Sequence, residues 1–158
     1  MKRTVHTLLY MMAATTVAAI ISSCQLNTPY SQYQPTEIEG WEKNDTLFYN
    51  VPPVKSAGRY RQTLGIRISD AFPFTSICLV VEQRIFPGRR SKVDTLRCRF
   101  TDEQGRLQGP GINLHQYQFP IGDIDLRPGD SLSIKVRHTM KRAIMPGISD
   151  VGIRIEHQ

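Results

Sequence analysis

The sequence has few of the residues that carry most enzyme chemistry. Its 158 residues include three cysteines, four histidines and one tryptophan. The motifs G-x-S-x-G, H-E-x-x-H and C-x-x-C are absent, as is the glycine-lysine loop that binds nucleotide phosphates. None of the histidines has a second metal ligand at a suitable spacing. The residues therefore predict a protein that is not an enzyme, with no catalytic residues, no metal and no cofactor.

Acidic residues form only weak candidates for cation binding. Asp123, Asp125 and Asp130 lie in "GDIDLRPGD", but this segment lacks the spacing, the glycine and the final glutamate of an EF-hand loop. Aspartate is common at turns because its side chain accepts bonds from nearby backbone N–H groups. We therefore interpret these three residues, and also Asp102 with Glu103, as turn residues.

Helical periodicity is missing after the first two dozen residues. No later segment keeps an apolar stripe at i, i+3, i+4 and i+7, whereas "RYRQTLGIRIS" alternates apolar and basic residues with period two. Several such segments are separated by glycine- and proline-rich turns, including a hairpin at Pro87-Gly88. The pattern predicts an all-β fold, an antiparallel β-sandwich of about seven or eight strands. The one candidate for a helix or 3₁₀ turn is residues 138–147, which Pro146 would cut short.

The N-terminus has the order of features found in an export signal. Lys2 and Arg3 precede an uncharged, mostly apolar run from Leu8 to Ile21. As a helix this run would span about 21 Å, less than the roughly 30 Å hydrocarbon core of a bilayer. It ends at Ile21-Ser22-Ser23-Cys24, which resembles the bacterial lipobox. We predict cleavage before Cys24 and lipidation of its thiol; the alternative is an ordinary signal or anchor in which Cys24 is incidental.

These signals divide the chain into three parts. Residues 1–23 are the predicted lipoprotein signal peptide, 24–44 a polar, lipid-anchored tether, and 45–158 the β-sandwich domain.

Removing the signal lowers the formal charge from +6 to +4. This mild excess is typical of a soluble domain, although a basic surface beside a membrane can also contact anionic lipid or glycan. The sequence lacks the basic stripe with interleaved aromatics that would indicate nucleic acid.

Two cysteines remain in the domain. Alternation in "SICLVVEQ" places Cys78 opposite the apolar face, whereas Cys98 lies on the apolar face of "DTLRCRF". Since a disulfide needs the two side chains on the same side, we favour two free thiols, with a disulfide as the alternative.

Two basic clusters are candidate contacts for a partner. The first is Arg89, Arg90 and Lys92 at the predicted hairpin tip, and the second is Met140 with Lys141 and Arg142. The alternative for each is a solvated loop.

Four segments resemble one known family. They are "DAFPFTSICLVVE" (70–82), "VDTL" (93–96), "DEQGRLQGPG" (102–111) and "MKRAIMPGISDVGIRI" (140–155). Together with the lipobox they resemble the gliding-motility lipoprotein GldH of the Bacteroidetes, over nearly the whole chain.

The resemblance implies a lipid-anchored, non-catalytic accessory or adaptor of the gliding machinery, which in these bacteria is tied to a dedicated protein secretion system. It implies protein partners in that machinery, and among site residues only Cys24 carries over. The residues after Cys24 include neither an aspartate at the next position nor an acidic cluster, which favours the periplasmic face of the outer membrane. The alternative is an envelope lipoprotein that binds a glycan or another ligand. It would need exposed aromatic side chains along a sheet, and the candidates are tyrosines such as Tyr49, Tyr60 and Tyr117, together with Trp41 and the phenylalanines.

Overall fold

The period-two segments of the sequence are strands whose apolar positions face a common core. The computed structural model describes residues 30–158. Within this range no helix is long and apolar enough to span a membrane. The ten strands of these residues are β1 (Tyr30–Pro35), β2 (Trp41–Glu42), β3 (Leu47–Val51), β4 (Gly58–Ser69), β5 (Ser76–Phe86), β6 (Arg90–Arg99), β7 (Leu114–Leu126), β8 (Ser131–His138), β9 (Ile144–Met145) and β10 (Ile148–His157).

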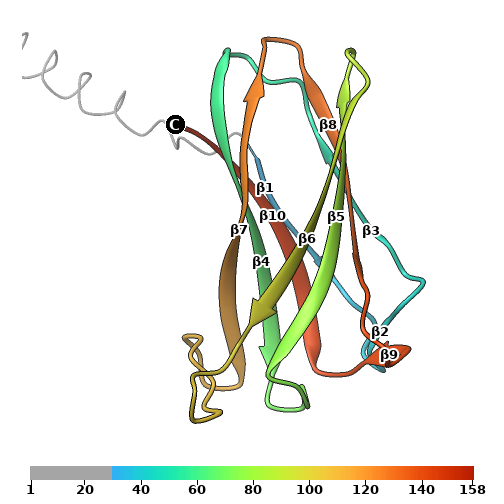
Figure 1. The fold of residues 1–158 in the computed structure, drawn as a ribbon, viewed down its shortest axis with the longest axis vertical. Helices are drawn as coiled ribbons and strands as arrows, with labels where there is room; N and C mark the ends of the chain where they lie inside the picture. Colours follow the sequence, from blue (N-terminus) through green and yellow to red (C-terminus); the bar gives the residue numbers. More distant parts are fainter. Residues whose placement is uncertain (1–29) are drawn as a thin grey trace, which may run out of the picture.

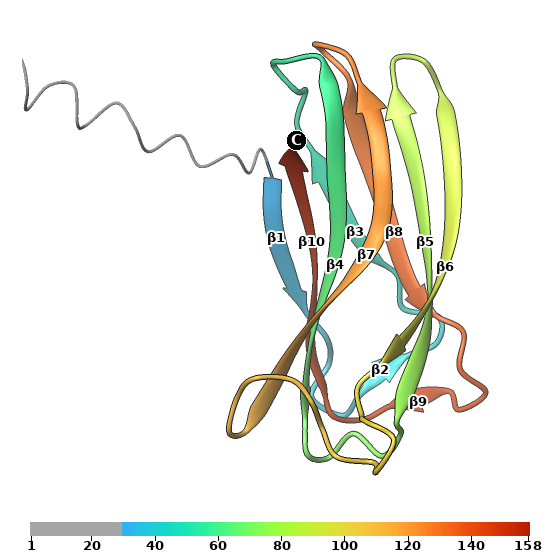
Figure 2. The same ribbon diagram turned by 60° about the vertical axis from the view of Figure 1, so that its left-hand side comes forward.

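The strands form two antiparallel sheets that pack face to face (Figure 1 and Figure 2). One, called here the β4 sheet, has the order β1-β10-β4-β7. The other, the β5 sheet, has the order β3-β8-β5-β6, and β2 and β9 make a small separate ribbon. The predicted all-β antiparallel sandwich is therefore confirmed.

Alternation along β4 shows how the sequence produces the core. Tyr60, Gln62, Leu64, Ile66 and Ile68 are at most 2% exposed, and the residues between them lie on the outer face. Gln62 is the one polar residue in this row.

A reciprocal amide pair accounts for this buried glutamine. Gln62 of the β4 sheet donates to Gln83 Oε1 of the β5 sheet at 2.6 Å, and Gln83 Nε2 donates back to Gln62 Oε1 at 3.1 Å. The pair satisfies two buried amides and ties the sheets together at mid-strand.

The described β-sandwich includes residues that precede Asp45, the predicted start of the domain. Residues 30–35 form β1, which pairs with β10 at the edge of the β4 sheet. The outward ring of Tyr33 covers Gly152 and Gly65, which face each other in the sheet, and Arg67 lies 4.5 Å from the ring centroid. Because Tyr33 packs on the outer face, β1 lacks the buried alternation by which the other strands were predicted.

The predicted helix or 3₁₀ turn at residues 138–147 is wrong. His138 still belongs to β8, and the segment after it bends into β9, where Met145 pairs with Trp41. Met145 is fully buried, so tertiary packing and Pro146 together override the local helical preference.

Both domain cysteines are free thiols, as predicted. Cys98 lies opposite Ile77 on the inner face of the β5 sheet, whereas Cys78 lies opposite Arg97 on the outer face. Burial, with a smaller contribution from Cys78, raises the pKa of the Cys98 thiol to about 12, so Cys98 is a core residue without thiolate character.

The sandwich has two ends with different loops (Figure 1). At the Tyr30 end, β1 begins beside the C-terminus. Three connections also lie there: residues 52–57, 87–89 and 127–130. The opposite end is called here the far end, and its connections are residues 36–46, 70–75, 100–113 and 139–147.

Candidate functional site

The far end brings together the loop residues of three of the four segments that resemble GldH. Residues 70–75, 102–111 and 140–147 all lie there, while the connections at the Tyr30 end belong to none of those segments. The loops are joined by specific contacts, which makes this end a preformed surface.

Gly147 allows the 139–147 connection to contact the 70–75 connection closely. Its φ is +78°, and its carbonyl accepts the N–H of Ser69 at 2.8 Å. A Cβ on residue 147 would lie 2.3 Å from the backbone nitrogen of Phe72 and 2.7 Å from the carbonyl carbon of Ala71. The glycine therefore allows residues 71–72 to touch the chain before β10, and only glycine fits this position without a shift.

An aromatic cluster packs between the far-end loops and the core. Phe72 and Phe100 pack edge to face with centroids 5.1 Å apart, and Phe100 lies 4.9 Å from Tyr117. Phe74 and Phe119 extend the cluster on either side. Edge-to-face pairs add stability beyond the burial of area, so this cluster fixes the base of the 100–113 loop.

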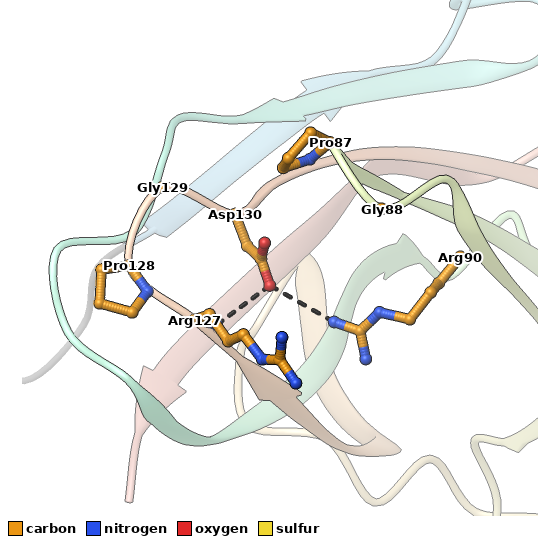
Figure 3. Close-up of a pocket in the computed structure, with 7 residues that line it drawn as sticks. All are labelled: Pro87, Gly88, Arg90, Arg127, Pro128, Gly129 and Asp130. Atoms are coloured by element: carbon orange, nitrogen blue, oxygen red, sulfur yellow. Dashed lines mark hydrogen bonds and ion pairs between the residues drawn. The ribbon is translucent and has the colours of Figure 1, made fainter.

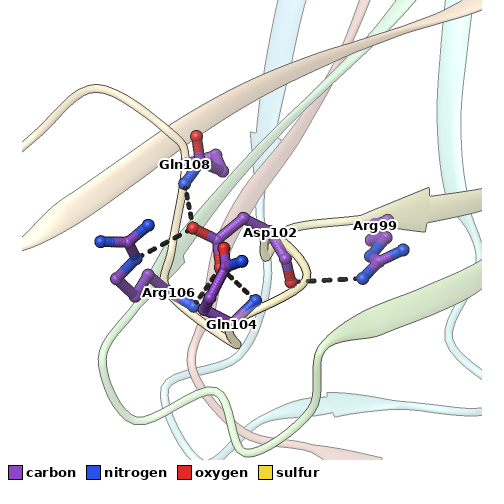
Figure 4. Close-up of polar contacts among 5 residues, drawn as sticks. All are labelled: Arg99, Asp102, Gln104, Arg106 and Gln108. Carbon is purple, nitrogen blue, oxygen red and sulfur yellow. Dashed lines mark hydrogen bonds and ion pairs between the residues drawn. The ribbon is translucent and has the colours of Figure 1, made fainter.

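Asp102 organises the loop above this cluster (Figure 4). Its Oδ1 accepts the backbone N–H groups of Gln104 and Arg106 at 2.9 and 2.8 Å. Its Oδ2 accepts bonds from the side chains of Arg106 and Gln108, both at 3.0 Å. Arg99 donates to the Asp102 carbonyl at 3.2 Å.

These bonds explain the electrostatics of Asp102. The pKa of the Asp102 carboxyl is lowered mainly by the hydrogen bond from the backbone N–H of Arg106. The hydrogen bond from the Arg106 side chain lowers it further. The carboxylate is a turn cap, as the sequence predicts.

The predicted contacts Met140, Lys141 and Arg142 lie on the far end. Met140 is half-buried, and its sulfur accepts the backbone N–H of Cys78 at 3.5 Å. Lys141 and Arg142 are exposed, and within residues 30–158 neither takes part in an ion pair. Met140 thus positions the loop, and the two cations are available to a partner.

The far end also exposes apolar side chains that the sequence reading missed. Ile38 and Ile112 are 99% and 88% exposed, and Leu114 and Ile144 are more than 40% exposed. Single isoleucines inside polar, glycine-containing loops such as "TEIEG" and "GPGIN" were the available signal. These residues lie in or beside three connections of the far end, and exposed apolar side chains are common at protein contact sites.

Trp41 closes the core beneath the far end. It is 1% exposed, and its ring meets that of His138 edge to face at 5.3 Å. His138 Nε2 lies 3.2 Å from the Trp41 carbonyl, while its Nδ1 is buried with no hydrogen-bond partner. Burial lowers the pKa of His138, so this histidine is a neutral core residue near pH 7.

The other predicted cluster lies in and beside the 87–89 connection at the Tyr30 end. Figure 3 shows its Arg90 beside Asp130. Arg90 Nη2 contacts Asp130 Oδ2 at 3.3 Å, and the same carboxylate oxygen accepts the backbone N–H of Arg127 at 3.0 Å. These contacts border a cleft of about 510 Å³ between the β5–β6 and β7–β8 turns. Arg90 therefore holds two turns together, and the two predicted clusters are at opposite ends of the domain.

Two of the three aspartates in the 122–130 segment also have structural partners. Asp123 pairs with Arg59 at 3.0 Å, and Asp130 caps its own turn. Among the residues that the structure describes, no three His, Cys, Asp or Glu side chains are close enough to hold a metal ion.

Comparison with known proteins identifies the family. The model of the GldH lipoprotein family matches residues 28–155, which is most of the chain. The chain belongs to the GldH lipoprotein family. A curated GldH relative, the gliding motility lipoprotein GldH of Flavobacterium johnsoniae, is 22% identical over 148 residues, which cover 89% of this chain and 92% of the relative. The protein is accordingly a gliding-motility lipoprotein that is anchored to a membrane of the cell envelope.

The similarity of this chain to solved structures such as the following two is weak. A ruminal GH26 endo-beta-1,4-mannanase matches 82% of this chain with 15% identity and a TM-score of 0.44, but the match covers only 26% of the enzyme. A family 35 carbohydrate binding module from Clostridium thermocellum matches 80% of this chain and 88% of its own, with 14% identity and a TM-score of 0.40. At these scores neither likeness bears on the function of the GldH chain.

Cys24, the predicted lipidation site, lies outside the described residues. Membership of a lipoprotein family agrees with a lipid anchor, and the assignment of that anchor to Cys24 stays a prediction from the lipobox.

Proposed function

We propose that this GldH protein is a non-catalytic adaptor, which carries a lipid on Cys24 and docks a protein partner of the gliding machinery and its associated secretion system. In this proposal it is anchored in the outer membrane and faces the periplasm. The observation that carries the proposal is the far end, where the preformed loops expose isoleucines as well as Lys141 and Arg142.

The architecture of the far end favours binding over chemistry. Asp102 is saturated with hydrogen bonds inside its own loop, and Met140 and Phe72 are packed against neighbouring segments. The exposed side chains that we assign to partner contact are Lys141, Arg142 and the isoleucines. Exposed carboxylates of the neighbouring connections, such as Glu37, Glu39 and Glu103, also lie at this end.

Distance also separates the far end from the anchor. The thirteen residues of β7 run from the far end to the Tyr30 end, which is about 40 Å at the rise of a β-strand. The anchored chain enters at the Tyr30 end. A partner bound at the far end is therefore held well away from the point of lipid attachment.

The alternative, a glycan-binding lipoprotein, has less support. Sugar-binding sheets use exposed aromatic side chains, but Trp41, Tyr49, Tyr60 and Tyr117 are all at most 9% exposed. The exposed aromatic rings among residues 30–158 are Phe48 and Phe86, which lie on β3 and β5 with β8 between them. The hydroxyl of Tyr49 donates to the Val151 carbonyl inside the core at 2.7 Å.

The test is an affinity pull-down of the tagged, lipidated protein from detergent-solubilised envelopes, with partners identified by mass spectrometry. We expect Lys141→Glu/Arg142→Glu to lower recovery of the partner at least about tenfold, because two like charges facing a partner's acidic contacts are strongly unfavourable. Lys55→Glu/Arg127→Glu, with the same change of charge at the Tyr30 end, should stay within about twofold of the wild type. Equal losses in both variants, or no recovery of a motility or secretion subunit by the wild type, would overturn the proposal.

A further inference from the structure

The outer face of the β5 sheet carries an excess of positive charge. The outward positions of β8, β5 and β6 hold five cations and a single carboxylate, and each of these three strands contributes. The five are Arg84, Arg97, Arg99, Lys135 and Arg137, and the acid is Glu82. We call this surface the basic face.

The basic face accounts for the whole net charge of the described residues. Residues 30–158 contain eighteen lysines and arginines and fourteen acids, since Lys2 and Arg3 are the only charged residues before them. Setting aside the basic face leaves thirteen of each sign. The charge of +4 is therefore located on one surface, whereas the rest of the domain is neutral.

The opposite face shows that this asymmetry is specific. On the outside of the β4 sheet, cations and acids alternate and pair: Arg59 with Asp123 at 3.0 Å, Arg67 with Asp150 at 3.4 Å and Arg154 with Glu156 at 2.9 Å. On the basic face only Arg137 has an acidic partner, Glu82 at 3.6 Å. Arg84 and Arg97 are exposed and form no ion pair within residues 30–158.

Apolar side chains accompany the cations. Phe48, Phe86 and Val93 are 50%, 42% and 65% exposed, and all three project from the outer side of the β5 sheet. The Lys135 ammonium lies 5.4 Å from the centroid of the Phe48 ring. The other strongly exposed large apolar residues among those described lie at the far end, and of these only Leu114, the first residue of β7, belongs to the outer face of the β4 sheet.

We propose that the basic face lies on the anionic phospholipid headgroups of the membrane that holds the lipid anchor. Cations attract the headgroup phosphates, and exposed Phe and Val side chains enter the boundary between headgroups and acyl chains. A lipid chain alone leaves the orientation of a domain free, and a second contact with the same membrane fixes it. The inference depends on lipid anchoring and not on the adaptor role.

The length of the tether allows this arrangement. Six residue steps separate Cys24 from Tyr30, so the part of the predicted tether that precedes β1 reaches at most about 20 Å. Tyr30 belongs to the β4 sheet, which stands about 10 Å above the β5 sheet. With the basic face on the headgroups, that separation and one layer of side chains can be spanned by the tether.

The test measures partition of the mature chain with Cys24→Ser, which removes the lipid and leaves both sheets and the whole core intact. Co-sedimentation with phosphatidylcholine vesicles is compared with vesicles that contain about 30% phosphatidylglycerol. We expect binding only to the anionic vesicles, weakening strongly as salt rises from about 0.1 M to about 0.5 M.

A matched pair of variants locates the contact. Arg84→Gln/Arg97→Gln should lower partition into anionic vesicles about thirtyfold, since each surface cation contributes about 1 kcal/mol. Lys141→Gln/Arg142→Gln removes the same charge at the far end and should stay within about twofold of the parent. Thermal unfolding midpoints verify that both variants fold.

Several outcomes of these experiments would overturn the proposal. Equal partition on both vesicle types, no effect of salt on the unsubstituted chain, or equal losses in the two variants would each overturn it. Retention on immobilised heparin that depends on Arg84 and Arg97, without binding to anionic vesicles, would also overturn it and would assign the basic face to an anionic glycan.

Discussion

The contact between Gly147 and the 71–72 backbone predicts a large cost for a single methyl group. In Gly147→Ala the new Cβ meets two effects, a positive φ of +78° and backbone atoms within 2.3 to 2.7 Å. The left-handed conformation costs about 1 to 2 kcal/mol for a residue with a Cβ. Forcing the methyl group into an occupied site costs about 1 to 3 kcal/mol more. We expect the free energy of unfolding to fall by about 2 to 5 kcal/mol, a large part of the stability of a domain of this size.

Gly105→Ala is the matched control, because Gly105 has nearly the same φ, +81°, and no atom lies within 4 Å of the position that its new methyl group would take. It should show only the conformational cost, about 1 to 2 kcal/mol. Urea unfolding of the unlipidated chain measures both, followed by the fluorescence of Trp41, which pairs with Met145 two residues before Gly147. If the two variants agree within about 0.5 kcal/mol, the two loops of the far end are not locked together by this contact and the reasoning fails.

Two further perturbations address the buried polar groups. Burial lowers the pKa of His138, so below pH about 6.5 the unfolded chain binds a proton that the folded chain does not. The contribution of His138 to the free energy of unfolding should therefore be constant above that pH. Below it, this contribution should fall by at most about 1.4 kcal/mol per pH unit. Urea midpoints between pH 7.5 and 5 measure this slope, which His138→Gln should reduce; an unchanged slope would contradict the assignment. Gln83→Leu leaves the Gln62 amide buried without its partner and should cost about 1 to 3 kcal/mol, whereas Gln62→Leu/Gln83→Leu should be closer to the wild type. A double variant less stable than the single one would show that the amide pair is not the unit of stabilisation.

The strands of the core were predictable because each carries its own signal. The alternation in β4, the Pro87-Gly88 turn between β5 and β6, and the alternation of Leu132, Ile134 and Val136 in β8 depend only on neighbouring residues. The same local logic placed Cys78 and Cys98 on opposite faces. Such patterns survive folding because the sheet imposes the same period on every strand.

The missed features depend on residues that only the fold brings together. β1 was hidden because Tyr33 packs on Gly65 and Gly152, which are 87 positions apart in the sequence. The ribbon of β2 and β9 needs Trp41 beside Met145, and neither short segment predicts a strand alone. The charge excess was visible in the composition, but the sequence could not show that β8, β5 and β6 are neighbours in one sheet.

The two proposed surfaces are compatible because they differ in direction. The basic face is the broad side of the β5 sheet, whereas the far end is the tip of the sandwich, about 40 Å along the strands from where the tether enters. A domain that lies on its basic face points its far end along the membrane and leaves the paired, neutral β4 face toward the aqueous side. The exposed apolar residues follow the same division, with Phe48, Phe86 and Val93 on the basic face and Ile38, Ile112, Leu114 and Ile144 at the far end. A partner embedded in or lying along the same membrane would then meet the loops of the far end from the side, without competition from the lipid contact.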